Sequence, residues 1–511
     1  MSSSVIIMIA ILLYLALMLG IGIKFSKTND SVDDFYLGGR KLGPLVTAMS
    51  AEASDMSSWL LMGLPGVAYL TGVCDAAWTA IGLGIGTWIN WLIVSKRIRR
   101  YSQRVSAITI PEFFGKRYHD KNNLMTAMAG LIIVIFFIPY TASGFAACGK
   151  LFSTLFDVDY LTAMIVCAVV IVGYTALGGF LAASTTDLIQ SIVMTVALAV
   201  VLGYGTMQAG GISAVIDNAK ELPGYLSLVH IHSAETNTAD SYGILSIVST
   251  MAWGLGYFGM PHILLRFMAS KDEKQLTLSR RIATVWVFIS MAAAIAIGVV
   301  GLGMTKAGAL KTLEGSDSET VIVNIANLLS GHGVFAAVVA GVILAGILAA
   351  TMSTADSQLL VAASSVSQNL FHDFFHVNLS KKASLIVARV TVIVISIISI
   401  FIASNPDSSV FGIVSFAWAG FGAAFGPVVL LALFWKRSNK YGALCGMLSG
   451  GVMVFVWKYI VRPIGGAFDI YELLPAFLVA LLVNVIVSLL TPAPDEEQIK
   501  EFEDVQKNVQ V

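Results

Sequence analysis

The chain has 511 residues, of which 57% are hydrophobic and only 12% are charged, and its formal net charge is zero. Soluble domains carry about 25% charged residues, so this chain has too little charge to cover a water-exposed surface. Its mean hydropathy of +0.82 agrees with that conclusion. Zero net charge also gives no electrostatic basis for binding nucleic acid. The composition indicates a polytopic membrane protein.

Apolar segments recur along the whole chain, and many of them reach the roughly 20 residues that span a bilayer. They predict an all-α membrane protein with about thirteen transmembrane helices. The expected spans are 5–24, 43–70, 74–95, 123–149, 159–178, 186–206, 244–265, 281–304, 334–371, 384–403, 407–435, 440–461 and 470–491. After them, residues 492–511 are expected to form a short, mobile tail.

Basic residues are distributed unevenly among the predicted loops. The segments 96–121, 271–281, 381–382 and 436–440 are rich in lysine and arginine, whereas 207–243 carries one lysine against four acidic residues. Loops rich in lysine and arginine stay in the cytosol. With thirteen spans, this alternation predicts an amino terminus outside the cell and a carboxyl terminus in the cytosol.

The second predicted span contains both acids and helix-breaking residues. It includes "SAEASDMSSWLLMGLPG", residues 50–66, with Glu52, Asp55 and then Gly63-Leu64-Pro65-Gly66. An acid inside a membrane costs several kcal/mol and marks a functional site by default. Proline and glycine interrupt a helix and release backbone carbonyls, so we expect the second span to break at 63–66.

The seventh span shows the same kind of interruption. "MAWGLGYFGMPHILLRF", residues 251–267, contains three glycines before Pro261. Interrupted helices at matching positions in two halves of a chain are typical of inverted-repeat transporters, which bind their substrates near the membrane midplane. A substrate site is therefore predicted between spans two and seven.

Hydroxyl side chains concentrate in the ninth span, where Ser353 and Thr354 lie about one turn from Ala350. Together with carbonyls released near Ala53 and Met56, they would form a small cage of neutral oxygens. Such hard ligands suit an alkali cation and favour Na⁺ as the driving ion. Asp55 also provides a possible proton site, so this reasoning leaves a proton as the alternative.

Five segments resemble motifs of the sodium/solute symporter family, in particular its bacterial sodium/proline branch. They are "LGGRKLGP", "ASDMSSWLLMGLPG", "WGLGYFGMPHILLRFM", "AATMSTADSQLL" and "WAGFGAAFGPVVLLALFWKR". The resemblance implies a leucine-transporter-like core of two inverted five-helix repeats. The repeats would occupy 43–206 and 244–435, joined by an extracellular loop at 207–243. A first helix and cytosolic loop at 1–42, two final helices at 436–491 and the cytosolic tail at 492–511 would flank the core.

The resemblance also implies roles for individual residues. The sodium site would use carbonyls of Ala53, Met56 and Ala350 and the hydroxyls of Ser353 and Thr354. The coupling and ion-path residues would be Asp55, Ser57 and Asp187. The substrate pocket would be lined by Ser57, Trp59, Gly63, Tyr140, Trp253, Tyr257, Met260 and Pro261.

Four positions differ from the residues usual in the proline branch: Glu52, Ser58, Met260 and Asp356. Arg40 and Arg266 lie at predicted cytosolic helix ends, where they either extend toward lipid headgroups or form gate ion pairs.

The predicted function is uptake of a small zwitterionic solute, L-proline first, driven by Na⁺ through alternating access at the plasma membrane. Another small amino acid, betaine or organic solute stays open, as does an ion channel. No HExxH or GxSxG motif indicates an enzyme, and no cofactor beyond Na⁺ as coupling ion, nor an obligatory protein partner, is expected.

Overall fold

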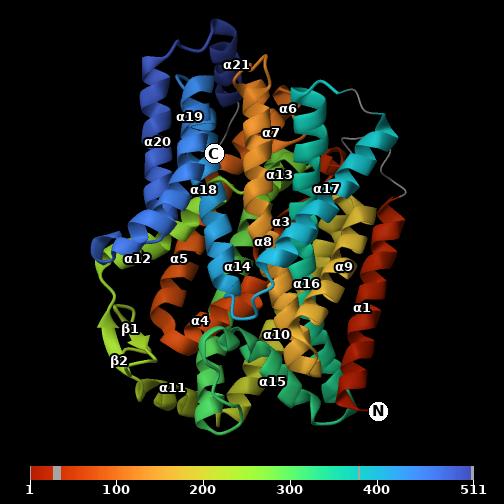
Figure 1. Cartoon of the computed structure of the whole chain (residues 1–511), viewed down its shortest axis with the longest axis vertical. Coiled ribbons are helices and arrows are strands. Elements are labelled where there is room, and N and C mark those ends of the chain that lie inside the picture. Colours follow the sequence, from red (N-terminus) through yellow and green to blue (C-terminus); the bar gives the residue numbers. More distant parts are fainter. Residues whose placement is uncertain (1, 27–35, 378–379, 508–511) are drawn as a thin grey trace.

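The protein is an elongated bundle of helices (Figure 1). This computed structural model describes residues 2–26, 36–377 and 380–507. Within these ranges, ten helices are long and apolar enough to cross a membrane, or eleven when a bent pair counts as one span. The predicted spans 43–70 and 159–178 correspond to shorter apolar pieces, Trp59–Thr71 and Tyr160–Gly173.

The first half of the chain begins with α1 and continues through the following elements. They are α1 (Ser3–Ser26), α3 (Pro44–Asp55), η2 (Trp59–Gly63), α4 (Leu64–Thr71), α5 (Val73–Ile89), η3 (Asn90–Val94), α6 (Ser95–Arg104), α7 (Ile110–Arg117), α8 (Leu124–Phe156), α9 (Tyr160–Gly178), α10 (Phe180–Gln208) and α11 (Ile212–Lys220). The helix predicted to end at 95 therefore continues through the π-helical η3 into α6.

The second half begins after a short hairpin, β1 (His230–Ser233) and β2 (Thr238–Ser241), whose strands pair antiparallel. This hairpin is a small exception to the predicted all-α class. The helices that follow are α12 (Ile244–Met251), η4 (Ala252–Phe258), α13 (Pro261–Ala269), α14 (Leu276–Lys306), α15 (Val321–Ser330), α16 (Val334–Ser364), η7 (Ser365–Phe374), α17 (Lys381–Ile402), α18 (Val410–Phe434), α19 (Lys440–Val456), α20 (Leu473–Leu490) and α21 (Glu496–Lys507).

Glycines allow the helices at the centre of the bundle to pack backbone against backbone. A Cβ atom on Gly82 of α5 would lie 2.4 Å from the carbonyl oxygen of Met251, and one on Gly86 would lie 2.3 Å from that of Gly254. Small residues permit such close approach between membrane helices. The contact fixes α5 against the interrupted segment α12–η4.

The prediction of a mobile tail is wrong for the part of the tail that the structure describes. Residues 496–507 form α21, which buries Phe502 and Val505. The guanidinium of Arg117 lies 5.2 Å from the Phe502 ring centre, and Gln506 donates a 2.6 Å hydrogen bond to the Leu433 carbonyl. The tail packs against the bundle because it forms an amphipathic helix. Its mostly polar composition did not reveal the few apolar residues that lie on one side of that helix.

The two ends of the bundle differ in character. In Figure 1, α1 begins at the same end as the β1–β2 hairpin and α11, whereas α6, α7 and α21 gather at the opposite end. The latter end carries the basic segment 96–121.

Candidate transport site

The second predicted span is interrupted, but not where the glycines and proline suggested. The α3 helix ends at Asp55, and the chain leaves helical geometry at Met56, where ψ is +44°. The predicted break at 63–66 is wrong because Pro65 occupies the first turn of α4. A proline there removes an N–H group that has no helical partner anyway.

This interruption releases two backbone carbonyls. In an unbroken helix the Ser57 N–H would bond to Ala53, but it bonds to the Asp55 carbonyl at 2.8 Å. Likewise the Leu60 N–H donates to the Ser57 carbonyl at 3.1 Å instead of to the Met56 carbonyl. The carbonyls of Ala53 and Met56 are thus both freed from the helical ladder, as the sequence predicted.

The seventh span is interrupted as predicted. Helix α12 gives way to the 3₁₀ segment η4, and α13 restarts at Pro261 after a bend of 44°. The N–H of Asn90 Nδ2 donates to the Tyr257 carbonyl at 3.1 Å, so a neighbouring helix satisfies part of the irregular backbone. Such compensation is what permits irregular backbone at membrane depth.

Four of the five predicted sodium ligands lie together between α3 and α16. The Ser353 hydroxyl oxygen lies 2.8 Å from the Ala53 carbonyl oxygen and 3.1 Å from that of Ala350. The Thr354 hydroxyl lies 3.2 Å from the same Ala350 oxygen. No contact recorded for Met56 brings its carbonyl to this group, although Met56 belongs to the same break and is buried.

Asp55 points away from these oxygens and toward the second interruption. Its Oδ2 accepts a 2.5 Å hydrogen bond from the Tyr257 hydroxyl of η4. The Asp55 carbonyl accepts bonds from the Tyr140 hydroxyl at 3.3 Å and from Trp59 Nε1 at 3.2 Å. Asp55 therefore connects the two interrupted spans with α8.

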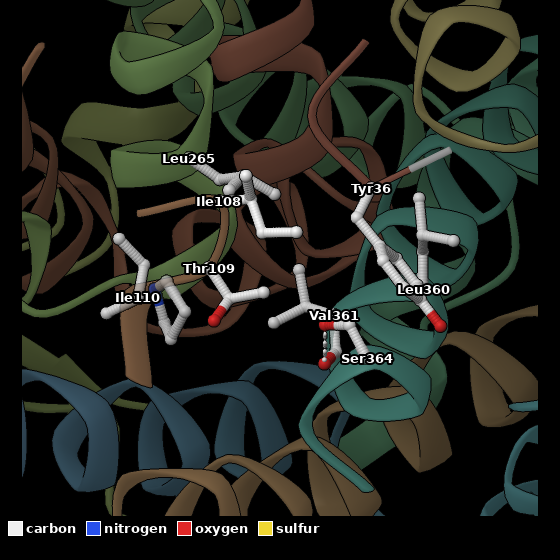
Figure 2. A pocket seen from close by; sticks show the side chains of 9 residues that line it. Tyr36, Ile108, Thr109, Ile110, Leu265, Leu360, Val361 and Ser364 are labelled. Carbon is white, nitrogen blue, oxygen red and sulfur yellow. Dashed lines mark hydrogen bonds between the residues drawn. The ribbon is translucent and has the colours of Figure 1, made fainter. Parts of the chain in front are cut away.

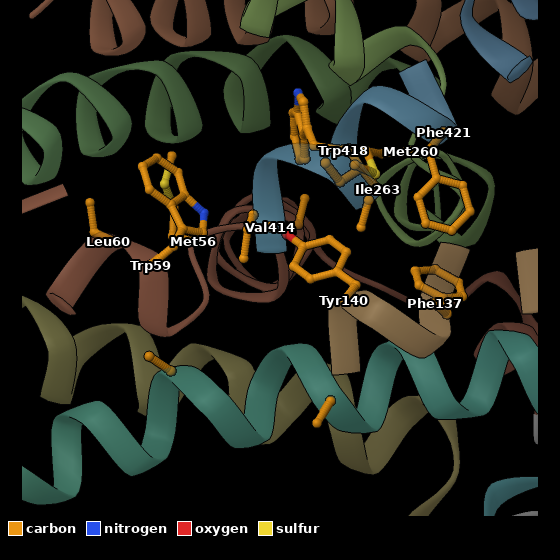
Figure 3. Close-up of a cluster of buried hydrophobic side chains, with 14 of the residues drawn as sticks. Met56, Trp59, Leu60, Phe137, Tyr140, Met260, Ile263, Val414, Trp418 and Phe421 are labelled. Atoms are coloured by element: carbon orange, nitrogen blue, oxygen red, sulfur yellow. The ribbon is translucent and has the colours of Figure 1, made fainter. Parts of the chain in front are cut away.

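Most of the predicted substrate-binding residues gather beside this connection. Trp59 and Trp253 lie 6.1 Å apart between ring centres, and Ser57, Tyr140, Met260 and Pro261 are buried near the two breaks. Figure 3 shows Trp59, Tyr140 and Met260 in one buried cluster with Val414 and Trp418 of α18. The cluster joins elements from both halves of the chain.

The sequence reasoning missed three aromatic residues of this cluster. Phe411 of α18 lies 5.2 Å from Trp253 between ring centres, and its backbone would meet a Cβ on Gly63 at 3.3 Å. Tyr471 stacks on Trp253 at 5.1 Å, and Trp418 donates to the Trp253 carbonyl at 2.7 Å. Only Trp418 lay within a quoted motif, and nothing in the sequence placed the other two beside spans two and seven.

Asp187 lies in a separate buried ionic cluster. Its Oδ2 is 3.2 Å from the Arg266 guanidinium and accepts a 2.6 Å bond from Ser50. Arg266 also donates to the Ser357 hydroxyl at 2.5 Å. Of the two roles considered for Arg266, the structure shows the ion pair, which ties α3 and α13 to α10 and α16.

A small pocket lies beside this cluster, toward the end of the bundle that carries the basic segment. Figure 2 shows Leu265 of α13 and Leu360, Val361 and Ser364 of α16 around it, with Thr109 from the segment before α7. Pro261, Tyr36, Ile108 and Ile110 complete the lining. Pro261 thus lies both at the restart of α13 and at the edge of this pocket.

Comparison with known proteins gives the family of this chain. The model of the sodium:solute symporter family matches residues 35–450. The sodium/proline symporter of Haemophilus influenzae is 41% identical over 98% of this chain and 97% of its own length. The osmoregulated proline transporter OpuE of Bacillus subtilis is 38% identical over 99% of both chains.

Two solved structures share the fold at low sequence identity. A Na⁺-coupled sialic acid symporter in a substrate-bound, outward-open state matches 96% of this chain and 99% of its own, with a TM-score of 0.77 and 18% identity. The transporter MhsT in complex with L-phenylalanine matches 87% and 98%, with a TM-score of 0.55 and 13% identity.

A bundle of membrane helices with two neighbouring interrupted spans, and with hydroxyl and carbonyl oxygens gathered beside one break, has the architecture of a secondary transporter. The chain belongs to the sodium:solute symporter family, as its sequence motifs indicated.

Proposed function

We propose that the protein couples the inward movement of Na⁺ to the uptake of a small zwitterionic solute, with L-proline as the first candidate. The observation that carries the proposal is the contact between Ser353 and the released Ala53 carbonyl, 2.8 Å apart. It joins the broken second span to α16 through oxygens that an alkali cation would coordinate. L-proline is the first candidate because relatives that are 38–41% identical to this chain are named as proline transporters.

The sodium site consists of the carbonyl oxygens of Ala53, Met56 and Ala350 and the hydroxyls of Ser353 and Thr354. When Na⁺ binds, both hydroxyls turn their oxygens toward the ion, and the interrupted span is drawn against α16. Because this ordering favours one arrangement of the break, it raises the affinity for solute at the adjoining site.

The solute site lies between the two interruptions and α8. Its lining would be Ser57, Trp59, Gly63, Tyr140, Trp253, Tyr257, Met260 and Pro261. The aromatic rings provide apolar faces for the proline ring, and the start of α13 offers unbonded N–H groups to the carboxylate. Asp55 lies two residues after Ala53 in the chain, and it accepts a hydrogen bond from the Tyr257 hydroxyl of the solute site. It therefore connects the sodium site with the solute site. Asp187 would act on the inward path.

Met260 favours one alternative within the same function. It is fully buried at the restart of α13 and offers a flexible thioether that adapts to differently shaped apolar ligands. A sodium-coupled symporter for another small amino acid, betaine or related solute is therefore the second candidate.

The topology proposed for the membrane has thirteen spans in which 43–206 and 244–435 form two inverted five-helix repeats. Segments 1–42 and 436–491 flank them, and 207–243 forms the extracellular loop with α11 and the hairpin. The amino terminus would be outside the plasma membrane and α21 in the cytosol. The collection of α6, α7 and α21 at one end of the bundle supports this orientation.

Labelled proline should accumulate in proteoliposomes only under an inward Na⁺ gradient. One charge crossing about 100 mV contributes roughly 2.3 kcal/mol, which supports a solute gradient near fiftyfold. The measurement is initial uptake with Na⁺ and with choline outside, and with other small zwitterions as competitors. Uptake that is equal in both media contradicts sodium coupling. Sodium-driven uptake of a competitor, without proline uptake, assigns the second candidate instead.

A further inference from the structure

Tyr471 contacts the aromatic cluster of the transport site from outside the two proposed repeats. It lies in the segment 457–472, which connects α19 to α20. Its ring stacks on the indole of Trp253, with 5.1 Å between ring centres and 23° between ring planes. Only 9% of Tyr471 is exposed. A flanking segment therefore forms part of the surroundings of a residue that we place in the solute site.

Hydrogen bonds to two different helices fix Tyr471. Its backbone N–H donates to the Ser249 hydroxyl of α12 at 2.7 Å. Its own hydroxyl donates to the Ser415 carbonyl of α18, also at 2.7 Å. The residue is thus held at its backbone and at the tip of its ring, and the ring keeps one orientation against Trp253.

Ion pairs fix the next residue, Glu472. Its carboxylate is completely buried and lies 3.2 Å from the Arg462 guanidinium and 3.5 Å from the Lys458 ammonium. Arg462 also pairs with Asp469 at 2.9 Å. A buried carboxylate is stable only with such partners, so these contacts tie the start of α20 to the earlier residues of its own segment. The backbone that carries Tyr471 is therefore fixed as well.

The indole of Trp253 is packed among several other aromatic groups. Trp59 and Phe411 lie 6.1 and 5.2 Å from it between ring centres, and Trp418 donates to the Trp253 carbonyl at 2.7 Å. In a close-packed interior, a side chain moves aside only when one of its neighbours moves too. Because Tyr471 covers one face of the indole, the position of the Trp253 ring depends on Tyr471.

We propose that Tyr471 is a positioning residue that limits, through Trp253, the size of the solute ring that the protein accepts. This inference rests on the proposed function, in which Trp253 packs against the ring of L-proline, and adds to it a selectivity for five-membered rings. With Tyr471 in place the indole cannot retreat, so a ring larger by one methylene group is excluded. Without the Tyr471 ring, the indole gains the space of a phenol group and the solute site widens.

The test is competition between labelled proline and pipecolate, the homologue with a six-membered ring, in proteoliposomes under an inward Na⁺ gradient. Half-inhibition of the wild-type protein should need at least about tenfold more pipecolate than unlabelled proline, the discrimination that one methylene group gives in an apolar site. Tyr471→Ala should reduce this ratio to about threefold or less. It should also raise the KM for proline about tenfold with kcat nearly unchanged, because looser packing on the solute ring weakens binding rather than the later steps.

Two further variants separate the ring of Tyr471 from its hydroxyl and from folding. Tyr471→Phe keeps the stacked ring and loses only the bond to Ser415, so it should restore the wild-type ratio to within about twofold. Tyr471→Leu keeps an apolar side chain in the same place and removes the aromatic face. It should lower the ratio at least about twofold, which measures the effect even if Tyr471→Ala does not fold.

The matched control is Phe468→Ala, which removes an aromatic ring from the same segment 457–472. Phe468 is 46% exposed, and its aromatic contact is with Trp457, at 6.2 Å between ring centres. Substitutions at such exposed positions change free energies little, so the pipecolate ratio and the KM for proline should stay within about twofold of the wild-type values.

A ratio that Tyr471→Ala and Tyr471→Leu leave unchanged overturns the role of Tyr471 and leaves the proposed function intact. Equal inhibition of the wild-type protein by pipecolate and proline overturns it as well, and so does an equal fall of the ratio in Phe468→Ala and Tyr471→Ala. Wild-type uptake of another zwitterion without proline uptake overturns the ring selectivity while Na⁺ coupling stands. Absence of Na⁺-driven uptake of any zwitterion overturns both the inference and the proposed function.

Discussion

The double variant Ser353→Ala/Thr354→Ala is expected to need on the order of a hundredfold more Na⁺ for half-maximal proline uptake. Each lost oxygen ligand removes roughly 1–1.5 kcal/mol of binding free energy, and 1.4 kcal/mol corresponds to a factor of ten in affinity. The two hydroxyls lie 2.8 to 3.2 Å from the carbonyls of Ala53 and Ala350, so their removal takes two oxygens out of the proposed site. Initial uptake rates across a Na⁺ series measure the change.

The control for this variant is Ser364→Ala/Ser365→Ala, which removes two hydroxyls farther along the same span. Both bond to the Val361 carbonyl of their own helix, at 2.8 and 2.9 Å. Their loss should change the Na⁺ requirement by no more than about twofold, since their hydroxyls contact Val361 whereas the Ser353 hydroxyl contacts the released Ala53 carbonyl. An equal shift in the two double variants would refute the assignment of Ser353 and Thr354.

Arg266→Leu is expected to destabilise the protein by about 3–5 kcal/mol, because it leaves Asp187 as an uncompensated buried charge. Arg266 is 1% exposed and its side chain also binds the hydroxyls of Ser50 and Ser357. Side chains of α3, α10 and α16 contact this guanidinium of α13. Its removal therefore weakens the packing of four elements at once. Thermal unfolding of the detergent-purified protein measures it through a lower midpoint.

The companion variant Arg266→Leu/Asp187→Leu separates charge from packing. Removing both partners of a buried ion pair costs less than removing one, so the double variant should unfold at a higher temperature than Arg266→Leu alone. If the double variant is the less stable of the two, the hydrogen bond that Asp187 accepts from Ser50 at 2.6 Å outweighs the relief of the buried charge.

The sequence predicted the membrane class and most of the spans because long apolar runs have few alternatives to a transmembrane helix. It also predicted which two spans are interrupted. It correctly indicated released carbonyls at Ala53 and Met56, but the break expected at 63–66 was wrong, since proline interrupts a helix only where its missing N–H was needed. At Pro65 a new helix was already starting, and the break at Met56–Ser58 has no proline to mark it.

The proximity of Ser353 and Thr354 to the Ala53 and Ala350 carbonyls, which we propose as sodium ligands, was predictable. Hydroxyls one turn from a carbonyl are visible in a single segment, and the family motifs indicated the partner segment. Contacts between residues far apart in the chain leave no comparable pattern in the sequence. Phe411 and Tyr471 reach Trp253 from more than 150 residues away, and Trp91 reaches Glu52 through a π-helical turn that sequence periodicity does not reveal. The tail after Pro492 appeared polar because only one narrow side of α21 is apolar.

Equilibrium binding of labelled proline to the purified protein, with Na⁺ and with choline in its place, most directly tests whether ion and solute sites are coupled through the interrupted span. Because the released Ala53 carbonyl and Asp55 belong to the same break, Na⁺ should lower the dissociation constant for proline by about tenfold or more, and proline should strengthen Na⁺ binding by the same factor. Equal affinity for proline in the two media would contradict the coupling.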